Sequence, residues 1–74
     1  MILAKGKRFF AWSPLRALMN DAGAKIVSRD AVDYLIEYLQ TQAVDITNRA
    51  TTLANHSKRK KITKGDIDLA VTGY

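Results

Sequence analysis

Residues 28–57 contain neither proline nor glycine, and this uninterrupted stretch constrains the fold more than any other feature of the chain. Its apolar residues recur at steps of one, three or four positions, which is the spacing of one face of an α-helix. They are Val32, Leu35, Ile36, Leu39, Ala43, Ile46, Ala50, Leu53 and Ala54. Ser28 can cap the first turn, where Asp30 suits the positive end of the helix dipole. We therefore expect a single helix that is roughly 40 Å long.

Shorter helices are predicted on both sides of the long one. Before it, Ser13 can act as the N-cap, Pro14 suits the first helical position, and Gly23 can end the helix after about ten residues. After it, Thr63 can cap a third helix. The apolar residues of that helix are Ile67, Leu69, Ala70 and Val71. The chain is thus predicted to be all-α, with a short, a long and a short helix.

A chain of this size has little with which to build a core. It has 74 residues and no cysteine, so neither a disulfide nor a thiolate metal site can stabilise it. Two short helices cannot cover the apolar stripe of the long helix while also burying their own. We therefore expect an obligate dimer in which a second chain supplies much of the core. The alternative is a monomeric three-helix bundle of the helix-turn-helix type, although the helices of such bundles are usually closer in length.

Positive charge is concentrated in two segments of the chain. The net charge is +5, with 12 Lys and Arg against 7 Asp and Glu. Residues 1–16 and 58–64 contain cations and no acid, whereas residues 17–57 contain more acids than cations. Binding a polyanion through several phosphates requires such basic surfaces. The alternative is that the charge only keeps a small protein in solution.

The second basic segment leads directly into the third helix. Lys58, Arg59, Lys60 and Lys61 are followed by Thr63, with Asp66 three residues later. A threonine with an acid at this spacing is similar to a capping box. Cations held beside the N-terminus of a helix form a favourable phosphate site. Nucleic acid is therefore the first candidate ligand.

Other function classes find little support in the sequence. His56 is the only histidine, which leaves no His-rich metal set, and we expect neither a cofactor nor catalysis. The apolar run at residues 1–4 is too short for the core of a signal peptide, and nothing approaches the roughly 20 apolar residues of a membrane span. We expect a cytoplasmic protein without a membrane partner.

The helix order and the local motifs resemble those of archaeal histones. In the first half, the matching residues are Asp21-Ala22-Gly23-Ala24, Val27-Ser28 and Asp30-Ala31. In the second half they are Ala50, Leu53-Ala54, His56, Arg59-Lys60, Ile62, Asp66-Ile67 and Leu69-Ala70-Val71. The resemblance implies a histone fold over residues 13–74, paired as a handshake dimer, with residues 1–12 as a basic and aromatic N-terminal segment.

The resemblance also implies how DNA is held. In such dimers the first loop of one chain lies beside the second loop of the other, and Lys60 and Lys61 would meet the DNA backbone with help from Thr63. The implied DNA-binding residues are Arg16, Lys25, Ile26, Val27, Ser28, Arg59, Lys60, Lys61 and Thr63. The implied function is packaging of duplex DNA, by bending and wrapping, largely without sequence specificity.

Further roles follow from the same resemblance. Arg59 and Asp66 match a pair that holds the second loop in place; the alternative is an ordinary surface ion pair of little energetic value. Leu53, His56, Asp66 and Leu69 match a contact between dimers, through which histones polymerise along DNA. The alternative for His56 is a solvated side chain at the favourable end of its helix. Gly23, besides ending its helix, matches a glycine that permits close stacking of successive DNA turns.

The chain departs from the family pattern at three positions. Ala17 and Ile26 stand where the family usually has arginines that enter the minor groove, as in histone wrapping generally. Arg16 and Lys25 are candidate substitutes, although a shift of one residue turns a helical side chain by about 100°. Asn20 replaces a family lysine.

The N-terminal segment interleaves cations with Phe9, Phe10 and Trp12 between Lys5 and the predicted first helix. This pattern suits a segment that lies across a phosphate backbone or groove. One alternative is that the aromatic rings pack on the helices while the cations stay solvated. A basic amphipathic membrane anchor is a further alternative, but the segment is too short to favour it.

The expected partners are double-stranded DNA, a second copy of the chain, higher oligomers on DNA and other histones, in the cytoplasm on the chromosome. One rival is a histone-fold subunit of a transcription or repair assembly that pairs with a different protein. Another is a sequence-specific regulator, which would show a large gap between specific and random DNA affinity. An enzyme is the weakest alternative.

Overall fold

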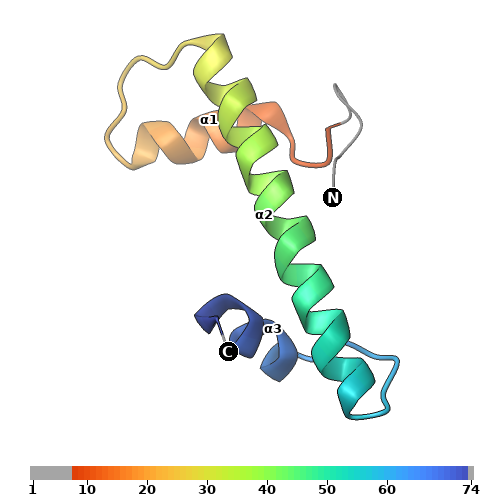
Figure 1. The fold of residues 1–74 in the computed structure, drawn as a ribbon. Helices are drawn as coiled ribbons and strands as arrows, with labels where there is room; N and C mark the ends of the chain where they lie inside the picture. The colour runs from red at the N-terminus through yellow and green to blue at the C-terminus, as the bar shows by residue number, and fades with distance from the viewer. Residues whose placement is uncertain (1–7, 74) are drawn as a thin grey trace. The chain divides into compact units, whose positions relative to one another are not determined.

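The computed structural model describes residues 8–73 of the chain. It contains three α-helices, α1 (Trp12–Asp21), α2 (Arg29–His56) and α3 (Lys64–Thr72), and no strand within the described residues (Figure 1). The 28 residues of α2 form one unbroken helix, which confirms the long central helix. The all-α class and the short, long, short order are also confirmed.

The beginning of α1 differs from the prediction. The helix begins at Trp12, with Ala11 as an extended N-cap residue that provides no side-chain hydrogen bond. The prediction that Ser13 is the N-cap was wrong, because Ser13 and Pro14 both lie inside the first turn. Proline is tolerated there, since the first N–H groups of a helix lack partners in any case. Trp12, predicted to belong to the N-terminal segment, is thus part of α1.

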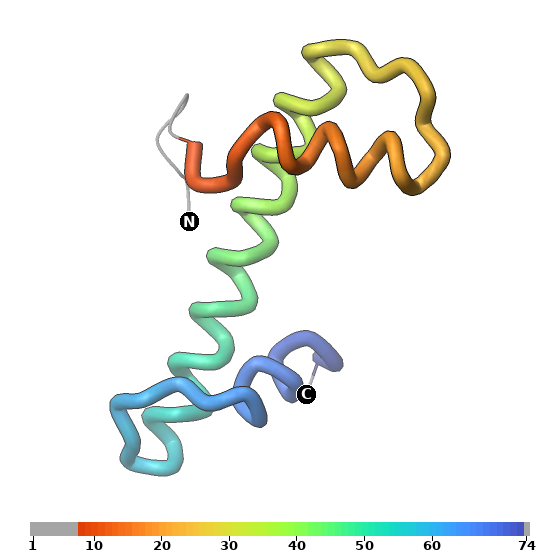
Figure 2. The backbone as a smooth tube through the Cα atoms, turned by 180° about the vertical axis from the view of Figure 1, so that it is seen from behind, coloured from red at the N-terminus to blue at the C-terminus, as the bar shows by residue number. Residues whose placement is uncertain are grey.

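Local capping ends α1 and begins α2 as predicted. The N–H of Gly23 donates to the carbonyl of Asn20, and the N–H of Ala24 donates to that of Met19, both at 3.0 Å. This is a Schellman motif, and it requires the left-handed backbone that Gly23 adopts at φ +117°. Across the link, which Figure 2 shows from behind, Ser28 Oγ accepts the N–H of Ala31 at 3.2 Å. Gly23 as a helix stop and Ser28 as an N-cap are both confirmed.

The chain divides into two compact units, an N-terminal unit that extends to Thr41 and a C-terminal unit that begins at Gln42. In the N-terminal unit, α1 packs against the first half of α2 around a buried cluster of Leu15, Val32 and Ile36. The partly buried residues packed against this cluster are Trp12, Met19, Val27, Leu35 and Leu39.

The segment before α1 is bonded to the first half of α2. The backbone N–H groups of Phe9 and Phe10 both donate to the side-chain oxygen of Gln40, which is buried. Arg8 forms an ion pair with Asp33 at 2.8 Å. The rings of Phe9 and Phe10 are exposed, whereas Trp12 packs against the buried cluster of the N-terminal unit. Lys5 and Lys7, further cations of the N-terminal segment whose pattern suits a position across a phosphate backbone or groove, are outside the described residues.

In the C-terminal unit, small side chains bring α3 close to the second half of α2. Ala50, Ala54 and Ala70 are buried. Arg49 donates to the carbonyl of Ala70 at 3.1 Å, near the end of α3 where carbonyl groups lack helical partners. The same side chain forms an ion pair with Asp45, four residues earlier on α2, at 2.7 Å.

Each unit leaves apolar side chains exposed. Only six apolar residues are buried among the described residues, and three of these are alanines. The exposed large apolar residues are Phe9, Phe10, Leu18, Ile26, Tyr34, Tyr38, Ile67, Leu69 and Val71. So much uncovered apolar surface on one chain is typical of a protein that associates with another. In the described part of the chain, no helix combines the length and hydropathy needed to cross a bilayer.

Candidate nucleic-acid interface

The loop between α2 and α3, residues 57–63, carries the basic run and leaves α2 through a second Schellman motif. The N–H of Lys58 donates to the carbonyl of Asn55 and the N–H of Arg59 to that of Ala54, both at 2.9 Å. Lys58 occupies the position that glycine usually takes and has a left-handed φ of +57°. The chain therefore turns away from α2 at the first cation of the run.

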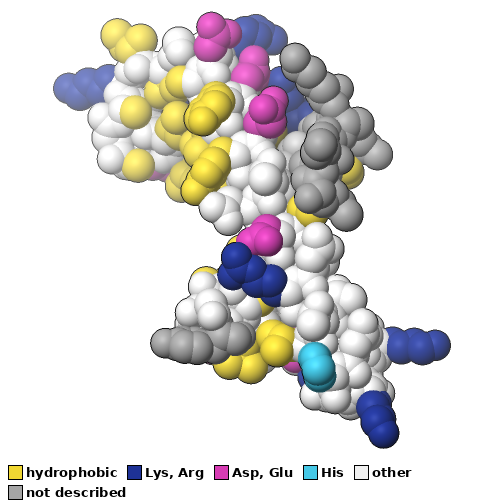
Figure 3. All heavy atoms as spheres, in the orientation of Figure 1, with side chains coloured by type: hydrophobic (Ala, Val, Ile, Leu, Met, Phe, Trp, Pro, Cys, Tyr) yellow, Lys and Arg dark blue, Asp and Glu magenta, His cyan; other side chains and the backbone are white. Residues whose placement is uncertain are grey.

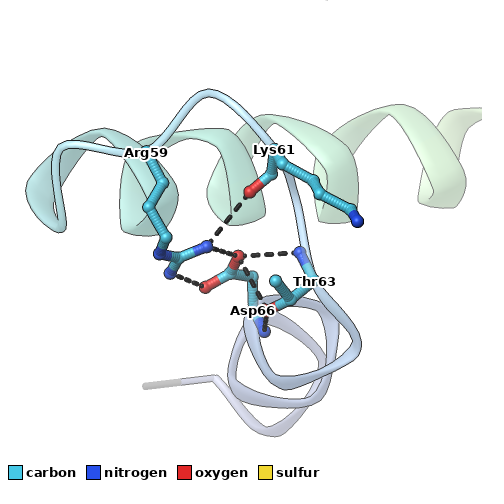
Figure 4. A network of polar contacts seen from close by, with 4 residues as sticks. All are labelled: Arg59, Lys61, Thr63 and Asp66. Carbon is cyan, nitrogen blue, oxygen red and sulfur yellow. Dashed lines mark hydrogen bonds and ion pairs between the residues drawn. The ribbon is translucent and has the colours of Figure 1, made fainter.

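Arg59 and Asp66 close this loop through a bidentate ion pair (Figure 4). Nη1 and Nη2 of Arg59 donate to Oδ2 and Oδ1 of Asp66, each at 2.9 Å. Arg59 Nη1 also donates to the carbonyl of Lys61 at 3.0 Å, which fixes the middle of the loop. The Asp66 side chain is only 6% exposed, whereas that of Arg59 is 38% exposed.

Thr63 and Asp66 form the capping box that begins α3. Thr63 Oγ1 accepts the N–H of Asp66, and Asp66 Oδ2 accepts the N–H of Thr63 at 2.9 Å. The hydrogen bonds from Arg59, followed by that from the Thr63 backbone, hold the pKa of Asp66 well below its usual range. Asp66 is therefore ionised at neutral pH, and its charge keeps the loop closed.

The lysines around this loop remain available to a ligand. Lys58, Lys60, Lys61 and Lys64 are not buried, and none forms an ion pair with another described residue. In Figure 3, Lys and Arg side chains project outward near the histidine. A fixed backbone with uncompensated cations is suited to bind phosphates, since the loop need not be ordered on binding. The hydroxyl of Thr63 is hydrogen-bonded to Asp66 in the helix cap, so Thr63 stabilises the loop that carries the lysines.

The first loop, between α1 and α2, has a different composition. Lys25 is exposed and Ile26 is 95% exposed, so both can reach a ligand. Val27 packs against the buried cluster of the N-terminal unit, and Ser28 caps α2. Two of the four predicted contact residues of this loop thus stabilise the fold locally. Arg16 is exposed on α1.

The predicted contact between dimers involves groups of differing accessibility. His56, the last residue of α2, is exposed, as is Leu69, whereas Leu53 is half-buried. Asp66 Oδ2 accepts three hydrogen bonds, but Oδ1 accepts only one, from Arg59. Oδ1 is therefore the oxygen with fewer hydrogen bonds in this buried carboxylate. Beside Gly23, the space that a Cβ would occupy is empty for 4 Å, which leaves room for close approach.

Two residues of the N-terminal unit were not predicted to act together. The guanidinium groups of Arg16 and Arg29 both lie over the ring of Trp12, at 5.7 and 5.6 Å from its centroid. The spacing of Trp12 and Arg16, four residues apart on one helix, was a signal in the sequence. Arg29 carries no such signal, because its contact with Trp12 depends on the packing of α1 against α2.

Within residues 8–73, no three His, Cys, Asp or Glu side chains gather as a metal ion would require.

The sequence model of the core histone domain family matches residues 14–73. The chain is 41% identical over 59 residues to one of the subunits of the archaeal histone HAN1 of Thermococcus zilligii, covering 80% of this chain and 88% of that protein. It is 34% identical over 61 residues to "Probable archaeal histone 3" of Methanocaldococcus jannaschii, covering 82% of this chain and 91% of that protein.

Proposed function

Because this chain belongs to the core histone family, we propose that it packages duplex DNA by bending and wrapping it, largely without sequence specificity. The observation that carries the proposal is the second loop, in which the Arg59–Asp66 pair fixes the backbone while Lys60 and Lys61 form no ion pair with a described residue. Contacts of this kind reach the phosphates, which are the same for every sequence. The protein acts as a structural component of the chromosome and not as an enzyme.

The DNA-binding unit is a homodimer of the handshake type. The exposed apolar residues on both units of the chain supply surface for this association. In the dimer, residues 25–28 of one chain and residues 59–63 of its partner form one combined site. Dimers join further through Leu53, His56, Asp66 and Leu69, so that the protein polymerises along DNA, with other histones as further partners.

A second candidate is a histone that pairs with a different chain. The name of the Thermococcus relative describes it as a subunit, which favours a heterodimer for that protein. Sedimentation of the purified chain distinguishes the two: a dimer of identical chains supports the main proposal, and a monomer that dimerises only with another histone supports the second.

The function is tested by replacing Lys60 and Lys61 with alanine together. We expect weaker binding to every duplex alike, and a log–log salt dependence of affinity that is shallower by about two per chain, because two phosphate contacts are lost. The measurement is fluorescence anisotropy of labelled duplexes of several sequences, at several salt concentrations.

Arg49→Gln is the matched control, because the Arg49 side chain is already paired with Asp45 and hydrogen-bonded to the Ala70 carbonyl. It should keep the wild-type salt dependence. An unchanged salt slope in the double lysine variant would contradict the proposed site, and a strong preference of the wild-type protein for one sequence would indicate a regulator instead.

A further inference from the structure

One aromatic ring of the N-terminal unit holds the cations of two helices. Trp12, the first residue of α1, lies within cation–π distance of Arg16 on the same helix and of Arg29, the first residue of α2. The three residues, which we call the Trp12 cluster, thus bring together guanidinium groups that the sequence separates by 13 positions.

The two arginines of the Trp12 cluster have no acidic partner among the described residues. The other described arginines each form an ion pair with an aspartate: Arg8–Asp33, Arg49–Asp45 and Arg59–Asp66. Asp33 lies four residues after Arg29 on the same face of α2, where the two would ordinarily pair. Arg8 holds that carboxylate at 2.8 Å instead. The charges of Arg16 and Arg29 are therefore uncompensated.

Trp12 provides a fixed support for these charges. It is partly buried and packs against the cluster of Leu15, Val32 and Ile36. Its indole Nε1 is buried and has no hydrogen-bond partner among the described residues, so the contribution of Trp12 comes from its ring and not from its N–H. A planar guanidinium already held on a ring loses less freedom when it binds a ligand.

We propose that the Trp12 cluster is a second phosphate-binding site of the chain, in which Arg16 and Arg29 contact the DNA backbone and Trp12 is a positioning residue. Guanidinium groups bind phosphate oxygens through two parallel hydrogen bonds. Arg29 is also the first residue of α2, at the positive end of the helix dipole, where a cation is unfavourable and an anion is attracted. The site rests on the proposed function, because its ligand is the same duplex DNA.

Charge removal tests the two arginines. Arg16→Gln and Arg29→Gln should each weaken binding to random duplex DNA about tenfold at low salt, and each should reduce the salt slope by about one. Arg49→Gln is the control for loss of an arginine charge outside the site. Affinities are measured by anisotropy of a labelled duplex over a range of salt concentrations.

Trp12→Leu tests the positioning role, because it keeps both charges and an apolar side chain. We expect weaker DNA binding, and a smaller effect of Arg29→Gln in this background than in the wild-type protein. Trp12→Phe should restore both the affinity and this coupling, since phenylalanine keeps an aromatic face. Circular dichroism verifies that each variant has kept its helices, and if Trp12→Leu unfolds, Trp12→Phe and the arginine variants carry the test.

Fluorescence provides an independent readout, since Trp12 is the only tryptophan of the chain. Adding duplex DNA should change its emission in the wild-type protein, and much less in Arg16→Gln combined with Arg29→Gln. If Arg29→Gln and Arg49→Gln bind DNA with the same affinity and salt slope, the site is wrong while the proposed function stands. If the wild-type chain fails to bind duplex DNA, the proposed function itself fails.

Discussion

Lys58 begins the basic run of the second loop and has a left-handed backbone conformation. It is the only non-glycine residue with positive φ in the described chain. A left-handed conformation costs a residue with a Cβ roughly 1–2 kcal/mol, which is why glycine is usual at this point of a Schellman motif. A lysine there adds a cation beside the carbonyl end of α2, where positive charge is favourable. Part of the backbone strain is thus offset by charge.

A comparison of Lys58→Gly with Lys58→Ala separates these two effects. Both variants remove the cation, but only glycine relieves the left-handed backbone. We expect Lys58→Gly to have a free energy of unfolding about 1 kcal/mol higher than that of Lys58→Ala. Urea denaturation at one fixed protein concentration measures the difference, and equal stabilities would show that the backbone at Lys58 is not strained.

At the scale of the elements, the sequence predicted helix caps and helix lengths well, but it did not predict how the helices pack. The Thr63–Asp66 capping box and the Gly23 stop depend on residues within a few positions of each other, so their spacing was enough to predict them. The length of α2 followed from the absence of any residue that breaks helices. The beginning of α1 was predicted wrongly because Trp12 packs on α2, a contact that no local pattern reveals.

The same limit applies to the candidate site. Lys60 and Lys61 stand out as part of a charged run, and neither is buried. Arg29 does not stand out, because it lies in a segment with more acids than cations. Arg29 lacks an acidic partner because Asp33 is paired with Arg8, and these two residues are 25 positions apart in the chain.

The closed second loop should make the stability of α3 dependent on pH. The pKa of Asp66 is lowered in the folded protein, so its ionised form stabilises the fold fully above the pKa of an unfolded aspartate, about 4. This contribution is lost as the pH falls from there toward the lower folded value. In Asp66→Asn we expect lower stability at neutral pH and a weaker decline in acid.

Urea denaturation at a series of pH values between neutral and acid checks this expectation. Asp68→Asn is the control, because Asp68 is exposed and forms no ion pair among the described residues. It should keep the decline of the wild-type protein. A parallel decline in Asp66→Asn would show that the Arg59–Asp66 pair does not couple folding to pH.

At the scale of the whole molecule, the chain is a component of an assembly. The described residues bury few large apolar side chains and expose many, which fits a chain whose core is completed by a second histone, in our proposal a second copy. Beyond the dimer, the proposed polymer depends on the exposed His56 and on Oδ1 of Asp66, which accepts one hydrogen bond. The sequence predicted that these residues belong together only through its resemblance to a family, since the joint role proposed for them lies between molecules.

His56→Ala should shorten or abolish the regular ladder of nuclease-protected DNA fragments while leaving the dimer intact. The imidazole is lost from the proposed contact between dimers, but it is exposed and not part of the buried core. Nuclease digestion of the reconstituted complex gives the ladder, and sedimentation gives the dimer. Asn55→Ala, at the neighbouring exposed position, is the control, and a full ladder from His56→Ala would count against the polymer contact.

The buried carboxylate of the Arg59–Asp66 pair has a consequence for how the proposed DNA complex dissociates. Mobile ions screen exposed charges strongly and buried charges much less. Rising ionic strength should therefore dissociate Lys60 and Lys61 from phosphates while the loop that carries them keeps its shape. The protein would then come off DNA already folded and able to bind again when the salt is diluted, without a cycle of unfolding and refolding.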